Sequence, residues 1–423
     1  ADGDKRFNAV SWVRDGAVLG RYYKQILPNY AVFDERRYFC AGSKPMVIEK
    51  LGCRFGVIVC EDAWVQGPAS CTIAAGAEIL LVPNASPFRD NKLEARLGAL
   101  HDRLEECGLP VVYSNLVGGQ DELVFDGRSI LMNAAGGFSI QTKPCEESLP
   151  IACFSPESGD LCFEGSEDQS SLDGKTICKE ENIIATIYTV LVRGLKDYVV
   201  KNGFTDVVLG LSGGIDSALT LALAVDALGP EHVHAVMMPS RHTSVLSLRL
   251  AREQAEMLQV AYREIPIEPA FEAMLGSLEV SFEGCKADVT EENLQARVRG
   301  NYLMALSNKF GWMVLATGNK SELAVGYSTI YGDMCGGFSP IKDCMKTRVY
   351  ELCDYRNTVS AAIPQAVIDR PPSAELAPGQ LDQDSLPAYD LLDQILHHYI
   401  ERDWSIAEIV SEGFEEAVVR RVA

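Results

Sequence analysis

The sequence predicts an α/β protein in which short buried strands alternate with helices. In its second half, the apolar runs Val207–Gly210, His232–Met238 and Met313–Thr317 are separated by long amphipathic stretches. Such alternation is typical of a parallel sheet covered by helices. The Ala/Leu-rich segment Ala218–Leu228 follows the first of these runs directly and is predicted to be helical.

The first half, from Phe7 to about Thr142, has the same character with shorter elements. One helix is predicted at Asn91–Glu106, after a turn at Pro87. Strands are predicted at Arg54–Val59, Glu78–Val82, Pro110–Tyr113 and Ser129–Met132.

A change in composition divides the chain. We expect a first domain at residues 1–142, an acidic linker rich in Ser, Gly and Glu at residues 143–182, and a second domain at residues 183–423. A chain of 423 residues is long enough for two domains, each with its own core. The part beyond Asp384 is expected to be helical.

Charge and cysteine usage restrict the classes of partner. A net charge of −21 argues against nucleic acid or an anionic membrane as the main partner. No apolar run has the length of a membrane-spanning helix. Thirteen cysteines without a CxxC pair favour reduced thiols in the cytoplasm over a disulfide framework or a zinc site.

The segment between the strand ending at Gly210 and the helix from Ala218 predicts an anion site. A glycine turn at a helix N-terminus exposes unpaired backbone N–H groups and the positive end of the helix dipole. Asp216 could hold Mg²⁺ against phosphate oxygens, and glycine permits positive φ and close approach of the backbone. The lysine of a Walker A loop is absent, and a chance strand–turn–helix junction is the alternative. The segment consists of Leu211, Ser212, Gly213, Gly214, Ile215, Asp216 and Ser217.

A second candidate site begins at Cys60, which ends a predicted strand and opens the turn Glu61–Trp64. A cysteine presented in this way is typical of a nucleophile on a sharp turn, although a core cysteine is the plain alternative. Lys24 lies upstream, in a segment that continues as Leu-Pro-Asn-Tyr.

Both segments resemble known families. The Ser212–Ser217 segment, SGGIDS, is similar to the signature of ATP pyrophosphatases, which form adenylates. Lys24 and Cys60 resemble the Lys and Cys of the nitrilase superfamily, which hydrolyses amides through a thioester. Most of the chain resembles glutamine-dependent NAD⁺ synthetases. The resemblance implies a partial nitrilase-like αββα sandwich joined to a doubly wound parallel-sheet, Rossmann-like ATP-pyrophosphatase domain.

In the first domain, the resemblance makes Cys60 the nucleophile and Lys24 the residue that stabilises the oxyanion. It also assigns Tyr30, Ser86 and Lys92 to the binding of L-glutamine. Without the family, Tyr30 is a half-buried aromatic residue, and the glycine-rich stretch Val117–Gly127, which also matches, is a hairpin loop.

In the second domain, the resemblance implies binding of ATP and of deamido-NAD⁺. Besides the Ser212–Ser217 segment, it assigns ATP contacts to Met238, Thr317 and Lys346, with Lys342 as a weaker candidate. Thr290 is expected to cap the helix that carries Arg297 and Arg299, which are either ligands or ordinary surface charges. The contacts to deamido-NAD⁺ are assigned to Asn293, Glu322 and Asp333.

The implied reaction amidates deamido-NAD⁺ to NAD⁺ through an acyl-adenylate, with ammonia released from glutamine at Cys60. Mg²⁺ would be shared by Asp216 and Glu322, since carboxylate and phosphate oxygens suit this hard cation. The ammonia would need a passage between the two sites. The family also implies a homo-oligomer, a dimer or larger.

Two features depart from the family. The expected Glu base has no counterpart in the 23 residues before Lys24, and the basic tail with a substrate-binding Lys is absent after Ala423. We therefore expect an incomplete N-terminus and a missing tail. Two alternatives stay open. One is another pyrophosphatase-loop ligase, similar to GMP or asparagine synthetase, and the other is a nitrilase-like scaffold without glutaminase activity.

Overall fold

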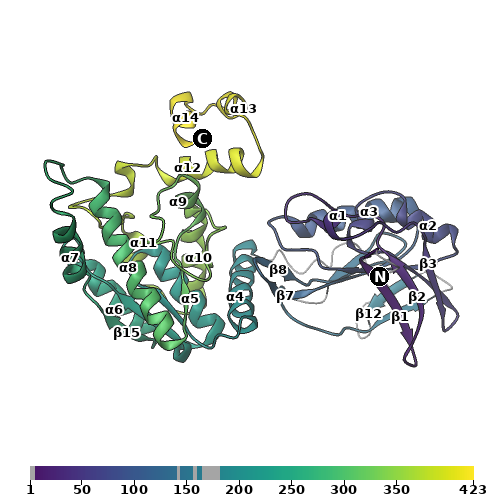
Figure 1. Cartoon of the computed structure of the whole chain (residues 1–423). Coiled ribbons are helices and arrows are strands. Elements are labelled where there is room, and N and C mark those ends of the chain that lie inside the picture. The colour runs from purple at the N-terminus through teal and green to yellow at the C-terminus, as the bar shows by residue number, and fades with distance from the viewer. Residues whose placement is uncertain (1–4, 141–142, 156–159, 164–181) are drawn as a thin grey trace. The chain divides into compact units, whose positions relative to one another are not determined.

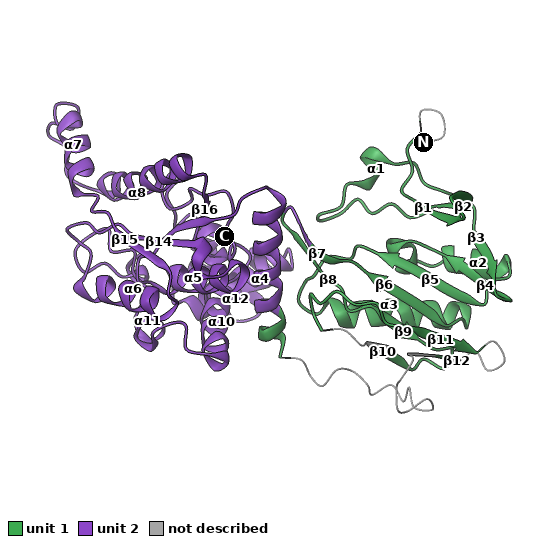
Figure 2. Cartoon of the chain, turned by 90° about the horizontal axis from the view of Figure 1, so that it is seen from below, with its two compact units in different colours: residues 1–118, 122–186 green, residues 119–121, 187–423 purple. Residues whose placement is uncertain are grey.

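The structure is a computed structural model that describes residues 5–140, 143–155, 160–163 and 182–423 (Figure 1). The chain forms two compact units, each with its own sheet (Figure 2). Unit 1 comprises residues 1–118 and 122–186, and unit 2 comprises residues 119–121 and 187–423. The predicted domain limits at residues 142 and 183 stay a prediction.

Unit 1 is built on a six-stranded sheet with the order β10-β9-β6-β5-β4-β3. Its centre, β4-β5-β6, is parallel, and the flanking pairs are antiparallel. The strands of this sheet are β3 (Met46–Lys50), β4 (Cys53–Val57), β5 (Ile79–Asn84), β6 (Val111–Asn115), β9 (Ile130–Met132) and β10 (Phe138–Ile140). The four predicted strands of this half therefore exist as β4, β5, β6 and β9.

Three helices and a 3-10 turn accompany this sheet. Helices α2 and α3 pack against each other and lie along one face of the sheet (Figure 1). Leu100 of α3 and Ala69 of α2 enter one core with Leu80 and Ile130 of the strands, and all four side chains are buried. The elements are α1 (Glu35–Tyr38), η1 (Cys60–Ala63), α2 (Pro68–Ala74) and α3 (Lys92–Cys107).

Among the residues that the structure describes, three two-stranded pairs lie outside this sheet: β1–β2, β7–β8 and β11–β12. The β1–β2 pair turns at Asp15-Gly16, both with positive φ, as a tight hairpin requires. The β11–β12 pair lies within the segment expected to be a linker, most of whose remainder is outside the described residues. The strands are β1 (Ala9–Arg14), β2 (Ala17–Tyr23), β7 (Val117–Gln120), β8 (Leu123–Asp126), β11 (Ala152–Ser155) and β12 (Asp160–Phe163).

Unit 2 contains a four-stranded, fully parallel sheet with the order β15-β14-β13-β16. The strands are β13 (Val207–Gly210), β14 (Val233–Met237), β15 (Ala261–Glu264) and β16 (Met313–Leu315). The chain runs outward from β13 through β14 to β15 and then returns to the other side of β13. Because parallel crossovers are right-handed, this reversal places helices on both faces of the sheet.

Figure 2 shows the two helical layers of unit 2, with α6 and α10 on one side of the sheet and α8 on the other. Helix α5 carries the Ala/Leu-rich segment and is almost wholly buried, which explains why it is apolar on all sides. From residue 183 to residue 369, the helices are α4 (Ile183–Lys201), α5 (Ile215–Leu228), α6 (Val245–Met257), α7 (Glu268–Leu278), α8 (Val289–Phe310), α9 (Lys320–Ala324), α10 (Lys346–Val359) and α11 (Gln365–Asp369), with the 3-10 turn η2 (Pro230–His232).

The part beyond Asp384 is helical, as predicted. Buried Leu392 and Leu396 of α12 form a core cluster with Tyr389. The elements are the 3-10 turn η3 (Asp382–Asp384), α12 (Tyr389–Leu396), the π-helical turn η4 (His397–Glu401), α13 (Ile406–Ser411) and α14 (Glu416–Val422). None of the helices in the described part of the chain is long and apolar enough to cross a membrane.

The cap predicted at Thr290 is wrong. Helix α8 begins at Val289, and its N-cap is Asp288, whose carboxylate accepts a hydrogen bond from the Thr290 N–H over 2.8 Å. Glu291 reaches back to the Asp288 N–H over 2.7 Å. This reciprocal capping box has two acceptor side chains, so it satisfies more backbone donors than a lone threonine would.

Candidate active sites

The first site lies in unit 1, where β4 leads through Ile58 and Val59 into the turn η1. Cys60 has a positive φ of 47°, which is rare for a residue with a side chain. The strand β4 ends at Val57, so Cys60 does not end it as predicted but opens the turn η1 three residues later. The sharp turn at Cys60 agrees with the prediction, and its role as a nucleophile stays a prediction. Burial raises the pKa of Cys60, whereas the Lys24 ammonium and the Ala85 N–H lower it.

Lys24 follows the end of β2 and is almost completely buried. Its Nζ lies 2.5 Å from Glu35 Oε1, at the start of α1. A buried ammonium needs such a partner, because desolvation without one would favour loss of its proton. Glu35 is an acidic residue eleven positions after Lys24 that the sequence motifs did not identify as its partner.

Two of the three residues assigned to glutamine binding contact this turn or the residue that follows it. The Tyr30 hydroxyl donates to Glu61 Oε1 over 2.8 Å, and burial together with Glu61 raises the Tyr30 pKa to about 12. Lys92 Nζ lies 4.1 Å from the centroid of the Trp64 ring. Both contacts involve residues of, or next to, the turn that begins at Cys60.

Ser86 is buried and held by a polar network. Its N–H donates to Asn115 Oδ1 over 2.9 Å, and its carbonyl accepts from Arg96 Nη2 over 2.8 Å. Arg96 is fully buried and forms a two-armed pair with Asp126, at 2.8 and 3.2 Å. A buried guanidinium with most of its donors satisfied fixes its neighbours, so Ser86 is rigidly placed.

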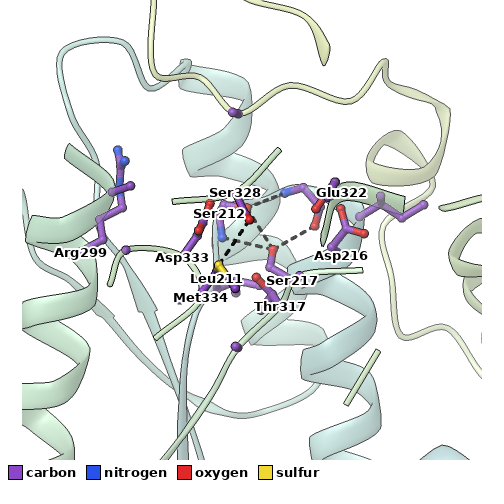
Figure 3. Close-up of a pocket in the computed structure, with 18 of the residues that line it drawn as sticks. Leu211, Ser212, Asp216, Ser217, Arg299, Thr317, Glu322, Ser328, Asp333 and Met334 are labelled. Carbon is purple, nitrogen blue, oxygen red and sulfur yellow. Dashed lines mark hydrogen bonds between the residues drawn. The ribbon is translucent and has the colours of Figure 1, made fainter. Parts of the chain in front are cut away.

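The second site is a cavity of about 350 Å³ at the carboxyl ends of β13 and β16 in unit 2 (Figure 3). The strand order reverses between these two strands, and in doubly wound sheets ligands bind at this switch point. Of the predicted residues, the structure places the following at the cavity wall: Leu211, Ser212, Gly214, Ile215, Asp216, Ser217, Met238, Thr317, Glu322, Asp333 and Lys346.

The loop after β13 is closed by its own serines. Ser217 Oγ donates to the Gly214 carbonyl over 2.9 Å and accepts from the Ser212 N–H over 3.2 Å. Gly213 has a φ of +77°, and a Cβ there would lie 2.5 Å from the Ser247 carbonyl oxygen. Gly213 thus backs onto α6 and does not line the cavity. The expectation of positive φ holds for Gly213 only, because Gly214 has a φ of −89°.

A buried ammonium joins the two acidic residues at the opposite end of the loop. Lys346 Nζ lies 2.6 Å from Asp216 Oδ2 and 2.9 Å from Glu322 Oε1. Burial alone would lower the pKa of Lys346, but the two carboxylates outweigh it and raise that pKa. Burial and the charge of Asp216 raise the pKa of Glu322 to about 7, although Lys346 acts in the opposite direction.

Two residues that the sequence analysis did not assign organise this trio. Asn319, the N-cap of α9, donates to Asp216 and accepts from the Glu322 N–H. Asp393 of α12 accepts from the Thr347 N–H over 2.8 Å and from the Ser321 hydroxyl. The bonds from Asn319 to Asp216 and from Asp393 to Thr347 and Ser321 join segments far apart in the sequence, so no local pattern could have predicted them.

The predicted contacts to deamido-NAD⁺ fall into two groups. Asp333 and Glu322 are at the cavity, and Figure 3 shows Asp333 between Arg299 and the Ser212 loop. Asn293 is not a lining residue and instead accepts a hydrogen bond from the Thr329 hydroxyl over 2.7 Å. Arg299 lines the cavity, donates to the Met238 carbonyl, and has its pKa lowered by burial to about 10.

Comparison with known proteins finds a match for each part of the chain. A family model described as NAD synthase matches residues 187–423, and one described as carbon–nitrogen hydrolase matches residues 1–158. The fold and sites therefore define a two-part carbon–nitrogen ligase, with a nitrilase-like domain and a parallel-sheet synthetase domain. The glutamine-dependent NAD(+) synthetases of Acinetobacter baylyi and Aquifex aeolicus are 48% and 45% identical to the chain.

These matches cover 99% and 98% of the chain, and 75% and 76% of the relatives. A solved glutamine-dependent NAD⁺ synthetase from Acinetobacter baumannii, in complex with ADP, superimposes with a TM-score of 0.81 at 44% identity. That match covers the whole chain and 76% of that protein. The chain belongs to the glutamine-dependent NAD⁺ synthetase family.

Proposed function

We propose that unit 2 carries out the ATP-dependent amidation of deamido-NAD⁺ to NAD⁺, and that unit 1 supplies ammonia by hydrolysing L-glutamine. The observation that carries this proposal is the cavity at the switch point, where the Ser212–Ser217 loop meets Asp216, Lys346 and Glu322. Family membership supports the use of glutamine as the nitrogen source.

In unit 2, the nicotinate carboxylate of deamido-NAD⁺ attacks the α-phosphorus of ATP, and the bond to the β-phosphate oxygen breaks. Pyrophosphate leaves, and an acyl-adenylate remains. We assign the leaving pyrophosphate to the backbone N–H groups and hydroxyls of the Ser212–Ser217 loop, at the N-terminus of α5. Lys346 neutralises charge as it develops on the phosphates.

Ammonia then attacks the acyl carbon, AMP leaves with the carboxylate oxygen, and one proton is released to give the amide. Activation as an adenylate is needed because a free carboxylate has no adequate leaving group. We assign Asp333 and Arg299 to the dinucleotide, since both line the cavity (Figure 3).

The donors of this site fit Mg²⁺. Asp216 and Glu322 each offer a carboxylate, both of which contact the Lys346 ammonium, and together with phosphate oxygens of ATP they could hold Mg²⁺ beside it. Bound Mg²⁺ would screen the negative charge of the phosphates during attack. The assignment of this metal, cytoplasmic location and a homo-oligomeric state remain predictions.

In unit 1, the Cys60 thiol gives up its proton and its sulfur attacks the amide carbon of glutamine; the same proton passes to the amide nitrogen, the C–N bond breaks and ammonia leaves. Water then hydrolyses the thioester to glutamate and restores the thiol. Lys24 stabilises the oxyanion of both steps, and Glu35 holds its ammonium in place. Tyr30, Ser86 and Lys92 are assigned to glutamine.

The test compares NAD⁺ formation with glutamine and with ammonium as nitrogen donor, using deamido-NAD⁺, ATP and Mg²⁺. Cys60→Ala should abolish synthesis with glutamine and preserve synthesis with ammonium. Asp216→Ala should abolish both. Retained glutamine-dependent synthesis in Cys60→Ala would overturn the assignment of the nucleophile, and retained ammonium-dependent synthesis in Asp216→Ala would overturn the role of the carboxylate.

A further inference from the structure

Asp62 is a fully buried carboxylate two residues after Cys60. Each of its two oxygens accepts two hydrogen bonds. Oδ1 accepts from the N–H groups of Gln25 and Ile26, over 3.1 and 2.8 Å. Oδ2 accepts from the Val59 N–H over 3.0 Å and from the Tyr22 hydroxyl over 2.8 Å. One side chain therefore satisfies four buried donors from two separate segments.

These two segments carry the catalytic pair of unit 1. Lys24 lies between Tyr22 and Gln25 in the first segment, and Cys60 lies between Val59 and Asp62 in the second. Among the hydrogen bonds within the described part of the chain, those that join residues 22–26 to residues 59–63 all end on Asp62.

The same carboxylate also closes the turn that carries the nucleophile. The Asp62 N–H donates to the Val59 carbonyl over 3.0 Å while its Oδ2 accepts from the Val59 N–H, so the turn is held from both sides. Cys60 sits inside this closed turn with its φ of 47°. A non-glycine residue keeps such a conformation only when its surroundings enforce it.

We infer that Asp62 is the positioning residue of the glutaminase site, which holds the Lys24 segment and the Cys60 turn together so that ammonium and thiol face each other. The inference rests on the catalytic roles proposed above for Lys24 and Cys60. Asp62 does not contact the reacting atoms and acts only through these two residues.

The chemistry explains why the residue is an aspartate. Asparagine offers one acceptor oxygen in place of two, and its amide N–H₂ would face donors. Glutamate keeps both oxygens but adds a methylene, which would displace one segment relative to the other in a fully packed core.

The test measures glutamine hydrolysis and the rate of Cys60 alkylation by iodoacetamide against pH, in the full chain. The titratable groups that interact electrostatically with the Cys60 thiol all stay unchanged in the variants. They are Lys24, Glu35, Glu61, Tyr30, Lys92 and Tyr113. For Asp62→Asn we expect kcat to fall about 10- to 100-fold with KM nearly constant, since the reacting groups are misplaced. The alkylation profile should move to higher pH, because Lys24 no longer lowers the pKa of Cys60.

Two further variants keep the inference open to disproof. Tyr22→Phe removes one of the four donors to Asp62 and leaves the three backbone N–H groups. Its kcat should therefore stay within about twofold of wild type, and its alkylation rate should depend on pH as in wild type. In Asp62→Glu, kcat should fall as it does in Asp62→Asn. This second variant tests the inference if Asp62→Asn does not fold. The exposed Asp102→Asn on α3 is the matched control.

A lowered melting temperature with unchanged kcat and alkylation profile, in either Asp62 variant, would show a merely structural role and overturn the inference. Equal losses of kcat in Tyr22→Phe and Asp62→Asn would overturn it as well, because the three backbone N–H groups bound to Asp62 would then not be what positions the site. Failure of the proposed function is distinguishable, since it would appear as glutamine hydrolysis that survives in Cys60→Ala.

Discussion

Asn319 Nδ2 donates a hydrogen bond to Asp216 Oδ1 over 2.8 Å, across 103 positions of the sequence. The other end of the same amide accepts from the Glu322 N–H over 3.0 Å. Asn319 is fully buried, so neither of these bonds competes with water. One amide therefore ties the Asp216 carboxylate to the backbone of Glu322, the other residue whose carboxylate faces Lys346.

Replacing Asn319 by aspartate tests this link. Aspartate caps a helix as well as asparagine does, so α9 should persist. A third carboxylate would, however, face Asp216 in place of a donor. We expect ammonium-dependent synthesis to fall roughly 10- to 100-fold, which corresponds to the 1–3 kcal/mol lost when a buried group loses its partner. Glutamine hydrolysis at Cys60 should not change.

Initial rates for both reactions are the measurement, and the exposed Asn308→Asp is the control. Equal rates of ammonium-dependent synthesis in Asn319→Asp and wild type would contradict the link between Asn319 and Asp216.

Asp393 stabilises the start of α10 from a different helix. Its carboxylate accepts from the Thr347 N–H in the first turn of α10, where negative charge is favourable, and from Ser321, whose hydroxyl accepts from the Lys346 N–H. Asp393→Asn should lower the free energy of unfolding of unit 2 by about 1–2 kcal/mol and raise the KM for ATP. Chemical denaturation and initial rates measure the two effects.

The matched control is Asp390→Asn, which changes an exposed carboxylate in the first turn of the same helix, α12. It should leave the KM for ATP unchanged. If both variants had the same KM, the contact of Asp393 with α10 would have no bearing on the position of Lys346.

Lys24 and Glu35 should shift the pKa of Cys60 in opposite directions. The Lys24 ammonium favours the thiolate of Cys60. Lys24→Met removes this positive charge, so the thiol pKa should rise. The Glu35 carboxylate disfavours the thiolate, so Glu35→Gln should lower the thiol pKa. Alkylation by iodoacetamide against pH reports both shifts.

Both variants should nevertheless lose glutamine hydrolysis, because Lys24→Met lacks the ammonium and Glu35→Gln no longer holds it in place. Glu35→Gln would then be slow in spite of a more acidic thiol. Lys44→Met, at an exposed position of unit 1, should match wild type. Parallel shifts in Lys24→Met and Glu35→Gln would exclude this electrostatic arrangement.

Two adjacent glycines should respond differently to alanine. A Cβ on Gly213 would lie 2.5 Å from the Ser247 carbonyl oxygen at a φ of +77°, whereas on Gly214 the nearest atom is the Ser212 hydroxyl, at 3.3 Å and a φ of −89°. We expect Gly213→Ala to lower the free energy of unfolding by about 1–3 kcal/mol and Gly214→Ala to lower it less. Denaturant unfolding of the two variants is a direct comparison, and a larger loss in Gly214→Ala would be inconsistent with the backbone described.

Local sequence patterns predicted the elements that carry the site better than the contacts within it. The loop from Ser212 to Ser217 was predictable because strand, glycine turn and helix are contiguous. The meeting of Asp216 with Glu322 followed from the rule that parallel strands end at one edge of the sheet. The β1–β2 hairpin was missed, although the Asp15-Gly16 pair between two apolar runs indicates a turn.

The residues that hold these groups in place could not be predicted. Glu35, Asp62, Asn319 and Asp393 act through hydrogen bonds to segments that only the folded chain brings near. Acidic and amide residues at such positions look like ordinary surface residues in a sequence. The capping box at Asp288 is different, since Asp288 and Glu291 have the required spacing and the sequence contained the signal.

The separation of Asp216 from Lys346, 130 positions along the chain, has a consequence for how the protein folds. During synthesis, β13 and the start of α5 emerge and can form long before α10 exists. Asp216 must therefore wait for its ammonium until α10, which follows β16 in the chain, brings Lys346 to it. Contacts of such long range are slow to form, because the intervening loop must close first. A nucleotide bound as proposed at this cavity would therefore stabilise unit 2 only after α10 has joined it.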